Sequence, residues 1–70
     1  MKISARNQFA GTVSAIKEGS VMAEVDVKLD AGPDMVAAIT RDSARRLHLG
    51  QGSKVVLIVK ATDVMVVTPE

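Results

Sequence analysis

Apolar and polar residues alternate along much of this chain, and the alternation predicts β-strands. Within residues 21–29 apolar side chains occupy every second position, a period that is typical of a strand with one buried face. Residues 9–17 alternate in a similar way, and the turn-forming sequence Glu18-Gly19-Ser20 separates the two segments. We therefore predict a β-hairpin over residues 9–29. Its candidate core side chains are Val13, Ala15, Ile16, Val21, Ala23, Val25, Val27 and Leu29.

A short helix is predicted in the second half of the chain. Thr40 is a suitable N-cap, and the helix it begins covers residues 41–47, with Ala44 and Leu47 on one face. The glycines at 50–52 are expected to end this helix. Residues 30–34 have the composition of a loop. Short apolar segments predict further strands at residues 3–8, 35–39, 55–59 and 64–67.

This order of elements predicts an all-β fold. Short strands around one small helix are typical of an OB-like Greek-key barrel with the helix between strands. Seventy residues are enough for a single domain, residues 1–70. A core of this size rarely provides more than about 3–5 kcal/mol of stability. The mean hydropathy of +0.21 is high for so small a protein, so we expect a homo-oligomer that hides apolar surface between its subunits.

Composition excludes several classes of function. The net charge of +1 and the single aromatic residue, Phe9, argue against a nucleic-acid-binding surface. The absence of cysteine and the single histidine, His48, argue against a metal-ion centre. No apolar segment is long enough to cross a membrane, and no secretory signal is recognisable, so a cytoplasmic location is expected. No nucleophile is accompanied by a base, so we do not expect an enzyme.

Hydrogen-bond donors are concentrated in three segments that contain few acidic residues. These segments are Ser4 to Gln8, Thr40 to Arg46, and Lys60 to Thr62. Together they could surround a tetrahedral oxyanion with hydroxyl, guanidinium, ammonium and backbone N–H groups. Each segment also has a simpler interpretation. Thr40 caps a helix in any case, and Arg45, Arg46 and Lys60 could simply be solvated.

The same three segments resemble those of a known family. The motifs Ser4-Ala5-Arg6-Asn7-Gln8-Phe9-x-Gly11, Ala38-Ile39-Thr40-x-x-Ser43 and Lys60-Ala61-x-x-Val64-Met65 are similar to those of the molbindins, which are Mop or TOBE-type domains. The resemblance covers roughly residues 2–68, and its first motif is the most specific. Because only one copy of the pattern is present, the chain looks like a free-standing member of the family.

The resemblance implies a function and a set of ligands. It implies an OB-like barrel that binds molybdate or tungstate between the subunits of a hexamer, a trimer of dimers, and that needs no organic cofactor. Such a protein would serve molybdenum storage and homeostasis. An OB-fold module that binds nucleic acid or a pterin cofactor is the alternative. Which of the two anions is physiological is left open by the sequence.

The resemblance also assigns residues to two sites. Arg6, Arg46 and Lys60 would supply charge to the main site, where Arg45 is an alternative to Arg46. The resemblance implies a second site, with more main-chain donors, near Glu18, Gly19, Ser20 and Val21. The residues implied for the main oxyanion site are Ser4, Arg6, Thr40, Ser43, Arg46, Lys60 and Ala61.

A shell that contains only donors favours a fully deprotonated anion. Phosphate keeps a proton near neutral pH and would present a donor to donors, whereas molybdate, tungstate and sulfate carry no proton there. Sulfate would have to be excluded by the size of the site.

Overall fold

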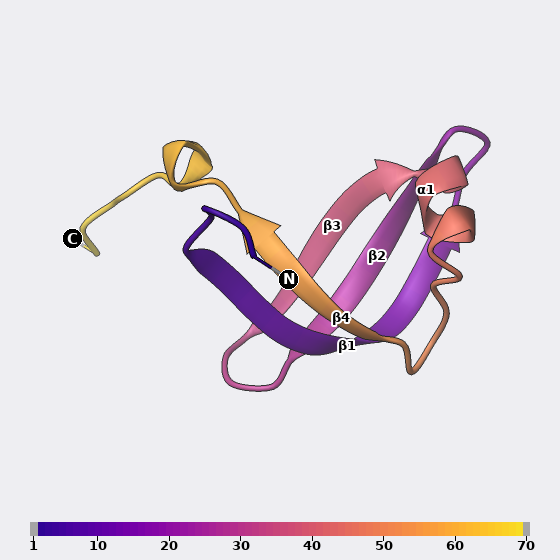
Figure 1. The fold of residues 1–70 in the computed structure, drawn as a ribbon, viewed down its shortest axis with the longest axis horizontal. Helices are drawn as coiled ribbons and strands as arrows, with labels where there is room; N and C mark the ends of the chain where they lie inside the picture. Colours follow the sequence, from indigo (N-terminus) through magenta and orange to yellow (C-terminus); the bar gives the residue numbers. More distant parts are fainter. Residues whose placement is uncertain (1, 70) are drawn as a thin grey trace.

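The computed structural model describes residues 2–69, which form a curled sheet that Figure 1 shows as an open half-barrel. Its antiparallel strands lie in the order β3-β2-β1-β4. Helix α1 follows β3, and a single 3₁₀ turn, η1, follows β4. The predicted all-β architecture with one short helix between strands is confirmed. The element bounds are β1 Asn7–Glu18, β2 Met22–Leu29, β3 Asp34–Thr40, α1 Arg41–Arg46, β4 Lys54–Val59 and η1 Ala61–Asp63.

Strands β1 and β2 form the predicted hairpin and contribute most of the core. Val13, Val25, Val27 and Leu29 are buried and form one hydrophobic cluster. The register shifts between Val13 and Ala15, which marks a β-bulge in β1. Because the extra residue moves the alternation by one position, Ile16 packs against this core cluster.

Two predicted terminal strands are absent from the described residues. Residues 3–6 precede β1, which begins at Asn7 and continues without a break through Phe9. Residues 64–67 have no strand structure, and Met65 is 94% exposed. A strand needs a hydrogen-bonded neighbour, and neither end of the chain finds one within the curled sheet. Val21, another predicted core residue, lies in the turn before β2 and is 68% exposed.

Helix α1 begins as predicted but ends differently. Thr40 is its N-cap, and Ala44 is buried. Leu47, predicted to share the buried face, is the C-cap and is exposed. The helix ends before the glycines, because His48 adopts a φ of 53°. The backbone N–H groups of His48 and Leu49 then donate to the carbonyls of Arg45 and Ala44, the pattern that usually places glycine at this position.

The positive φ of His48 leads us to a prediction about stability. We expect His48→Gly to raise the free energy of unfolding by about 0.5–1 kcal/mol, because glycine adopts the left-handed conformation without a Cβ penalty. Urea unfolding at one fixed protein concentration measures this change. His48→Ala keeps the backbone penalty and is the control. Equal stability of the two variants would contradict the assignment.

Among residues 2–69, no helix has the length and apolar character needed to cross a lipid bilayer.

Candidate functional site

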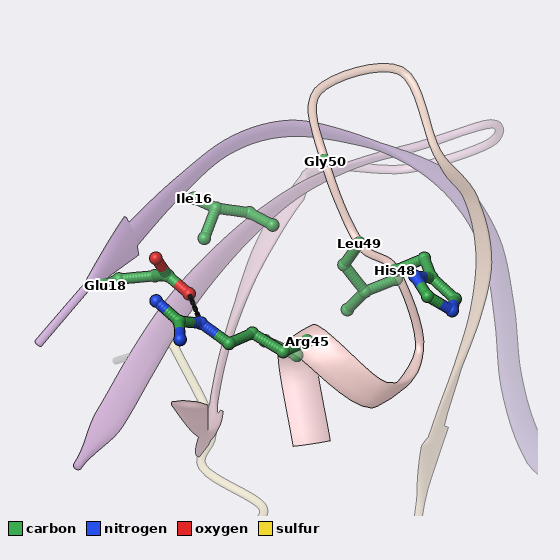
Figure 2. Close-up of a pocket in the computed structure, with 7 residues that line it drawn as sticks. Ile16, Glu18, Arg45, His48, Leu49 and Gly50 are labelled. Carbon is green, nitrogen blue, oxygen red and sulfur yellow. Dashed lines mark hydrogen bonds and ion pairs between the residues drawn. The ribbon is translucent and has the colours of Figure 1, made fainter. Parts of the chain in front are cut away.

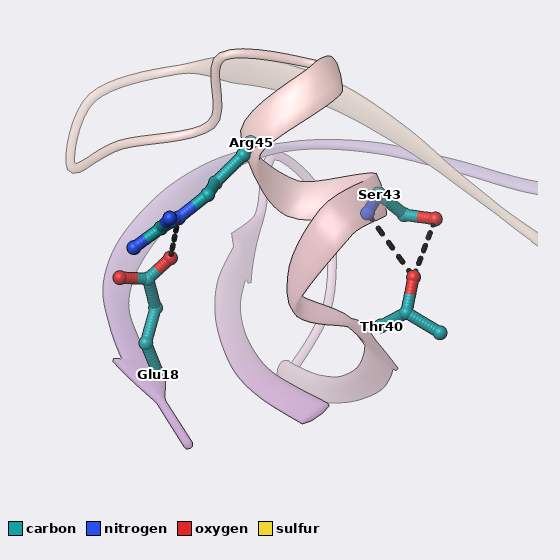
Figure 3. Close-up of polar contacts among 4 residues, drawn as sticks. All are labelled: Glu18, Thr40, Ser43 and Arg45. Atoms are coloured by element: carbon teal, nitrogen blue, oxygen red, sulfur yellow. Dashed lines mark hydrogen bonds and ion pairs between the residues drawn. The ribbon is translucent and has the colours of Figure 1, made fainter. Parts of the chain in front are cut away.

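Three of the predicted site residues are connected by hydrogen bonds at the start of α1. The backbone N–H of Ser43 donates to Thr40 Oγ1 at 3.1 Å, and the Thr40 hydroxyl donates to Ser43 Oγ at 2.8 Å (Figure 3). A guanidinium nitrogen of Arg46 donates to the same Ser43 oxygen at 3.2 Å. We call Thr40, Ser43 and Arg46 the helix cluster. Its hydroxyls and one permanent cation lie on one side of the helix, because residues three apart on a helix are neighbours.

The structure distinguishes the two adjacent arginines. Arg45 Nε donates to Glu18 Oε1 at 3.2 Å, an ion pair that joins α1 to the end of β1 (Figures 2 and 3). Both side chains are roughly half exposed, at 57% and 40%, so the pair contributes little stability. The pair sets the direction in which the Arg45 side chain points, which is toward Glu18 and away from Ser43. The geometry therefore brings Arg46, and not Arg45, to the helix cluster.

The other four residues predicted for the main site lie together at the opposite end of the sheet. Ser4, Arg6, Lys60 and Ala61 line one surface depression, and we call them the terminal cluster. The pairing of β1 with β4 explains this proximity. Asn7 is opposite Val59, so the residues just before β1 and just after β4 must lie side by side.

The remaining walls of this depression come from residues that were not among the seven assigned to the main site. Ile3 and Ile58 add apolar surface, and Thr62 adds a hydroxyl. Thr62 ends the donor-rich segment Lys60 to Thr62, so the sequence already indicated its hydroxyl, although the resemblance did not assign it to the site.

Neither cluster is neutralised by acidic side chains within the described part of the chain. The ion pairs present among residues 2–69 are Lys17 with Glu24 and Arg45 with Glu18. Arg6, Arg46 and Lys60 therefore keep their charge available for an anion. Asp42 lies in the first turn of α1 but is adjacent to Ser43 in sequence, and successive helical residues do not face each other.

The two clusters are separated within one copy of the chain. In Figure 1, α1 lies at one end of the long axis, whereas η1, the start of β1 and the end of β4 lie toward the other. The helix cluster therefore has two hydroxyls and one cation, and the terminal cluster has two cations, a hydroxyl and the backbone at Ala61. A single copy does not bring all seven predicted residues around one point.

The predicted second site is the turn between β1 and β2. The backbone N–H of Gly19 donates to the Met22 carbonyl at 2.7 Å, and the Val21 carbonyl accepts from the Arg41 N–H at 2.8 Å. Among residues 2–69 the N–H groups of Ser20 and Val21 donate to no backbone or side-chain acceptor. The Glu18 carboxylate is held by Arg45. The turn therefore has two backbone donors available beside the start of α1.

A separate pocket lies beside this ion pair. Glu18, Arg45 and His48 line it together with Ile16 and Leu49 (Figure 2). Its carboxylate and guanidinium are paired with each other and leave no net charge for an anion, and the described residues contain no cluster of three or more side chains suited to a metal ion. This pocket is a poor candidate for the oxyanion.

The comparisons with known proteins identify the family. The TOBE domain family matches residues 3–66. Molybdenum-pterin-binding protein 3 of Clostridium pasteurianum is 41% identical over 94% of this chain and 97% of its own length. The molybdenum transport protein ModE of Azotobacter vinelandii is 47% identical over 97% of this chain. The chain spans about a quarter of the length of that ModE relative, since 25% of it is covered.

Solved structures agree with this assignment. MopII from Clostridium pasteurianum superposes with a TM-score of 0.89 at 39% identity, covering 96% of this chain and 100% of MopII. ModG, a cytoplasmic molybdate-binding protein solved with molybdate bound, gives a TM-score of 0.84 at 59% identity, over 87% of this chain and 43% of ModG. The predicted OB-like fold and the predicted family are confirmed. The chain belongs to the TOBE domain family and is of the Mop, or molbindin, type.

Proposed function

We propose that this protein binds molybdate, or the similarly shaped tungstate, between copies of itself and thereby stores molybdenum in the cell. The observation that carries the proposal is the separation of two donor clusters, each without a paired carboxylate, at opposite ends of one chain. The molybdate-bound ModG structure, from a protein 59% identical over the matched region, supports the choice of anion.

Each cluster alone offers too few donors to enclose a tetrahedral anion. A dianion of this kind has four oxygens, and removing it from water is favourable only when most of them are hydrogen-bonded. If the terminal cluster of one copy met the helix cluster of another, three cations and three hydroxyls would surround the anion. The site would then consist almost entirely of donors, which favours an anion without a proton.

Exposed apolar surface supports an assembly of copies. Met65, Val66 and Val67 are 94%, 91% and 89% exposed, and they follow directly after the terminal cluster. The strands β3 and β4 are at the edges of the sheet, with no partner on their outer sides in the described residues. Unpaired edges and apolar termini are stable in water when another subunit covers them. We propose a homo-oligomer, and the resemblance to molbindins implies a hexamer built as a trimer of dimers.

A second anion is proposed at the turn of residues 18–21. Its support is the pair of available N–H groups at Ser20 and Val21. Two backbone donors are fewer than the main site would have, so we expect this turn to bind more weakly and to need main-chain groups from neighbouring copies.

Molybdate titration with two readouts tests the main proposal. Native mass spectrometry is expected to show an oligomer whose mass increases by whole numbers of bound anions. At about one hundred times the dissociation constant, binding should raise the melting temperature by roughly 10–20 °C. An unchanged melting curve at molybdate concentrations far above micromolar would contradict molybdate binding. Anions bound only to monomers would contradict a site between subunits.

The pterin alternative has one observation in its favour. The relatives from Clostridium pasteurianum are named molybdenum-pterin-binding proteins. A pterin ring prefers an aromatic partner, and the only aromatic residue here is Phe9, in β1 and 37% exposed. Calorimetric titration with molybdate and, separately, with a pterin distinguishes the two ligands. We expect a heat of binding in the titration with molybdate and none in the titration with the pterin.

A further inference from the structure

The segment of residues 3–6 carries two residues of the proposed main site but belongs to no strand. Ser4 and Arg6 line the depression of the terminal cluster, whereas β1 and its pairing with β4 begin only at Asn7. Among the described residues, no backbone–backbone hydrogen bond joins this segment to the rest of the chain. Chain ends of this kind are poorly ordered unless something ties them down. The geometry of this half of the site therefore depends on what holds residues 3–6.

The side chain of Gln8 supplies that restraint. Its amide nitrogen Nε2 donates to the Ala5 carbonyl at 2.7 Å, and this is the one hydrogen bond that residues 3–6 form within the described part of the chain. A carbonyl oxygen only accepts, so the direction of donation is fixed. Ala5 lies between Ser4 and Arg6 in the sequence, so a bond that restrains Ala5 restrains both of its neighbours.

Strand register places Gln8 next to the depression without making it part of the wall. Gln8 is opposite Ile58 in the pairing of β1 with β4, and residues opposite each other lie on one face of a sheet. Ile58 lines the depression together with Ile3, whereas Gln8 does not line it. The N-terminal segment therefore lies on the same face of the sheet as the Gln8 side chain, which reaches Ala5 but not the space for the anion.

We propose that Gln8 is a positioning residue for molybdate, whose bond to Ala5 fixes Ser4 and Arg6 in the terminal cluster before the anion binds. This inference rests on the proposed function and gives a role to a residue of the first sequence motif that belongs to neither cluster. Without the bond, the segment would have to be ordered at the moment of binding, and the affinity would fall with the fraction of time that the segment is in place.

Calorimetric titration of the whole protein with molybdate measures this effect. Gln8→Met keeps the length of the side chain but removes the donor, and we expect it to weaken binding about threefold to tenfold. The same loss is expected in a Lys60→Ala background. In the double variant Ser4→Ala/Arg6→Ala the loss should disappear, because Gln8 then has no side chain to position. Gln51→Met changes an exposed glutamine outside both clusters and is the matched control, with wild-type affinity expected.

Limited proteolysis without any anion tests whether Gln8 holds the segment. Trypsin cuts after arginine and lysine, and its rate at a site follows the population in which that site is open. We expect Gln8→Met to raise the rate of cleavage after Arg6 by about threefold to tenfold, the effect of losing one hydrogen bond between neutral groups. The rate after Lys17, which is exposed but lies within β1, should not change.

The results separate positioning from a general structural effect. An equal loss of affinity in all three backgrounds overturns the proposal, as does wild-type affinity in Gln8→Met. If the double variant binds too weakly to titrate, the rate after Arg6 decides alone, and an unchanged rate overturns the proposal. Should circular dichroism show that Gln8→Met is unfolded, Gln8→Ala replaces it in both measurements. A wild type that binds no molybdate contradicts the proposed function itself, and the cleavage rates still test the restraint that Gln8 places on residues 3–6.

Discussion

Replacing Lys60 with alanine is expected to weaken molybdate binding by about tenfold to a hundredfold, the range for losing a charge-assisted hydrogen bond. Lys60 lies directly after β4, in the same depression as Ser4 and Arg6. Among residues 2–69 no carboxylate is paired with it, so its charge is available to the anion. The molybdate-induced rise in melting temperature should shrink by the same free energy. Calorimetry and thermal unfolding with and without molybdate measure both effects.

Lys54→Ala is the matched control for this prediction. Lys54 is at the opposite end of β4, is exposed, and carries the same charge, but it lies outside both clusters. If the affinity for molybdate depends only on the overall charge of the protein, the two variants will bind molybdate equally weakly. A specific site requires that Lys54→Ala retain nearly wild-type affinity.

A mixture of two variants tests whether the site is shared between copies. Lys60→Ala damages the terminal cluster, and Arg46→Ala damages the helix cluster, so neither variant alone has an intact composite site. In oligomers reassembled from equal amounts of both, about a quarter of the interfaces would combine two intact clusters, assuming random association. High-affinity binding should therefore return at about that stoichiometry. If each copy formed its own complete site, mixing would restore nothing.

Gly11→Ala is expected to lower the free energy of unfolding by about 1–3 kcal/mol, the usual cost of overpacking. A Cβ at this position would lie 2.7 Å from the Lys28 carbonyl oxygen and 2.7 Å from Val27 Cγ1. The first of these atoms belongs to the backbone of β2, so relief requires the central strand pair to move apart. For a domain of this size the melting temperature should fall by about 4–8 °C per kcal/mol. Thermal unfolding at fixed protein concentration measures it.

Gly50→Ala provides the comparison for Gly11. No atom lies within 4 Å of the position that its Cβ would take, and its φ is not in the left-handed range. We expect the stability of this variant to equal or slightly exceed that of the wild type, because alanine restricts the unfolded chain. If the two alanine variants melt at the same temperature, the close approach at Gly11 has no energetic importance.

The local elements of this fold could be predicted from the sequence because their causes are local. The period-two pattern of 21–29 gives the buried face of β2, and Thr40 followed by Ser43 gives the start of α1. The sequence predictions were wrong where a strand needed a neighbouring strand to pair with, and where a different backbone conformation ended an element. Residues 64–67 are apolar enough for a strand but have no strand to pair with, and His48 ended the helix before any glycine.

The candidate site residues were proposed from the motifs, but their arrangement in space could not be. The sequence alone determined that hydroxyls and cations occur in three short segments with few acids, because composition and spacing are visible without a fold. Only the tertiary structure decided that Ser4 and Arg6 lie beside Lys60, that Arg45 is held by Glu18, and that the helix cluster lies at the far end of the sheet. These facts follow from strand register and sheet curvature, which depend on contacts between residues distant in sequence.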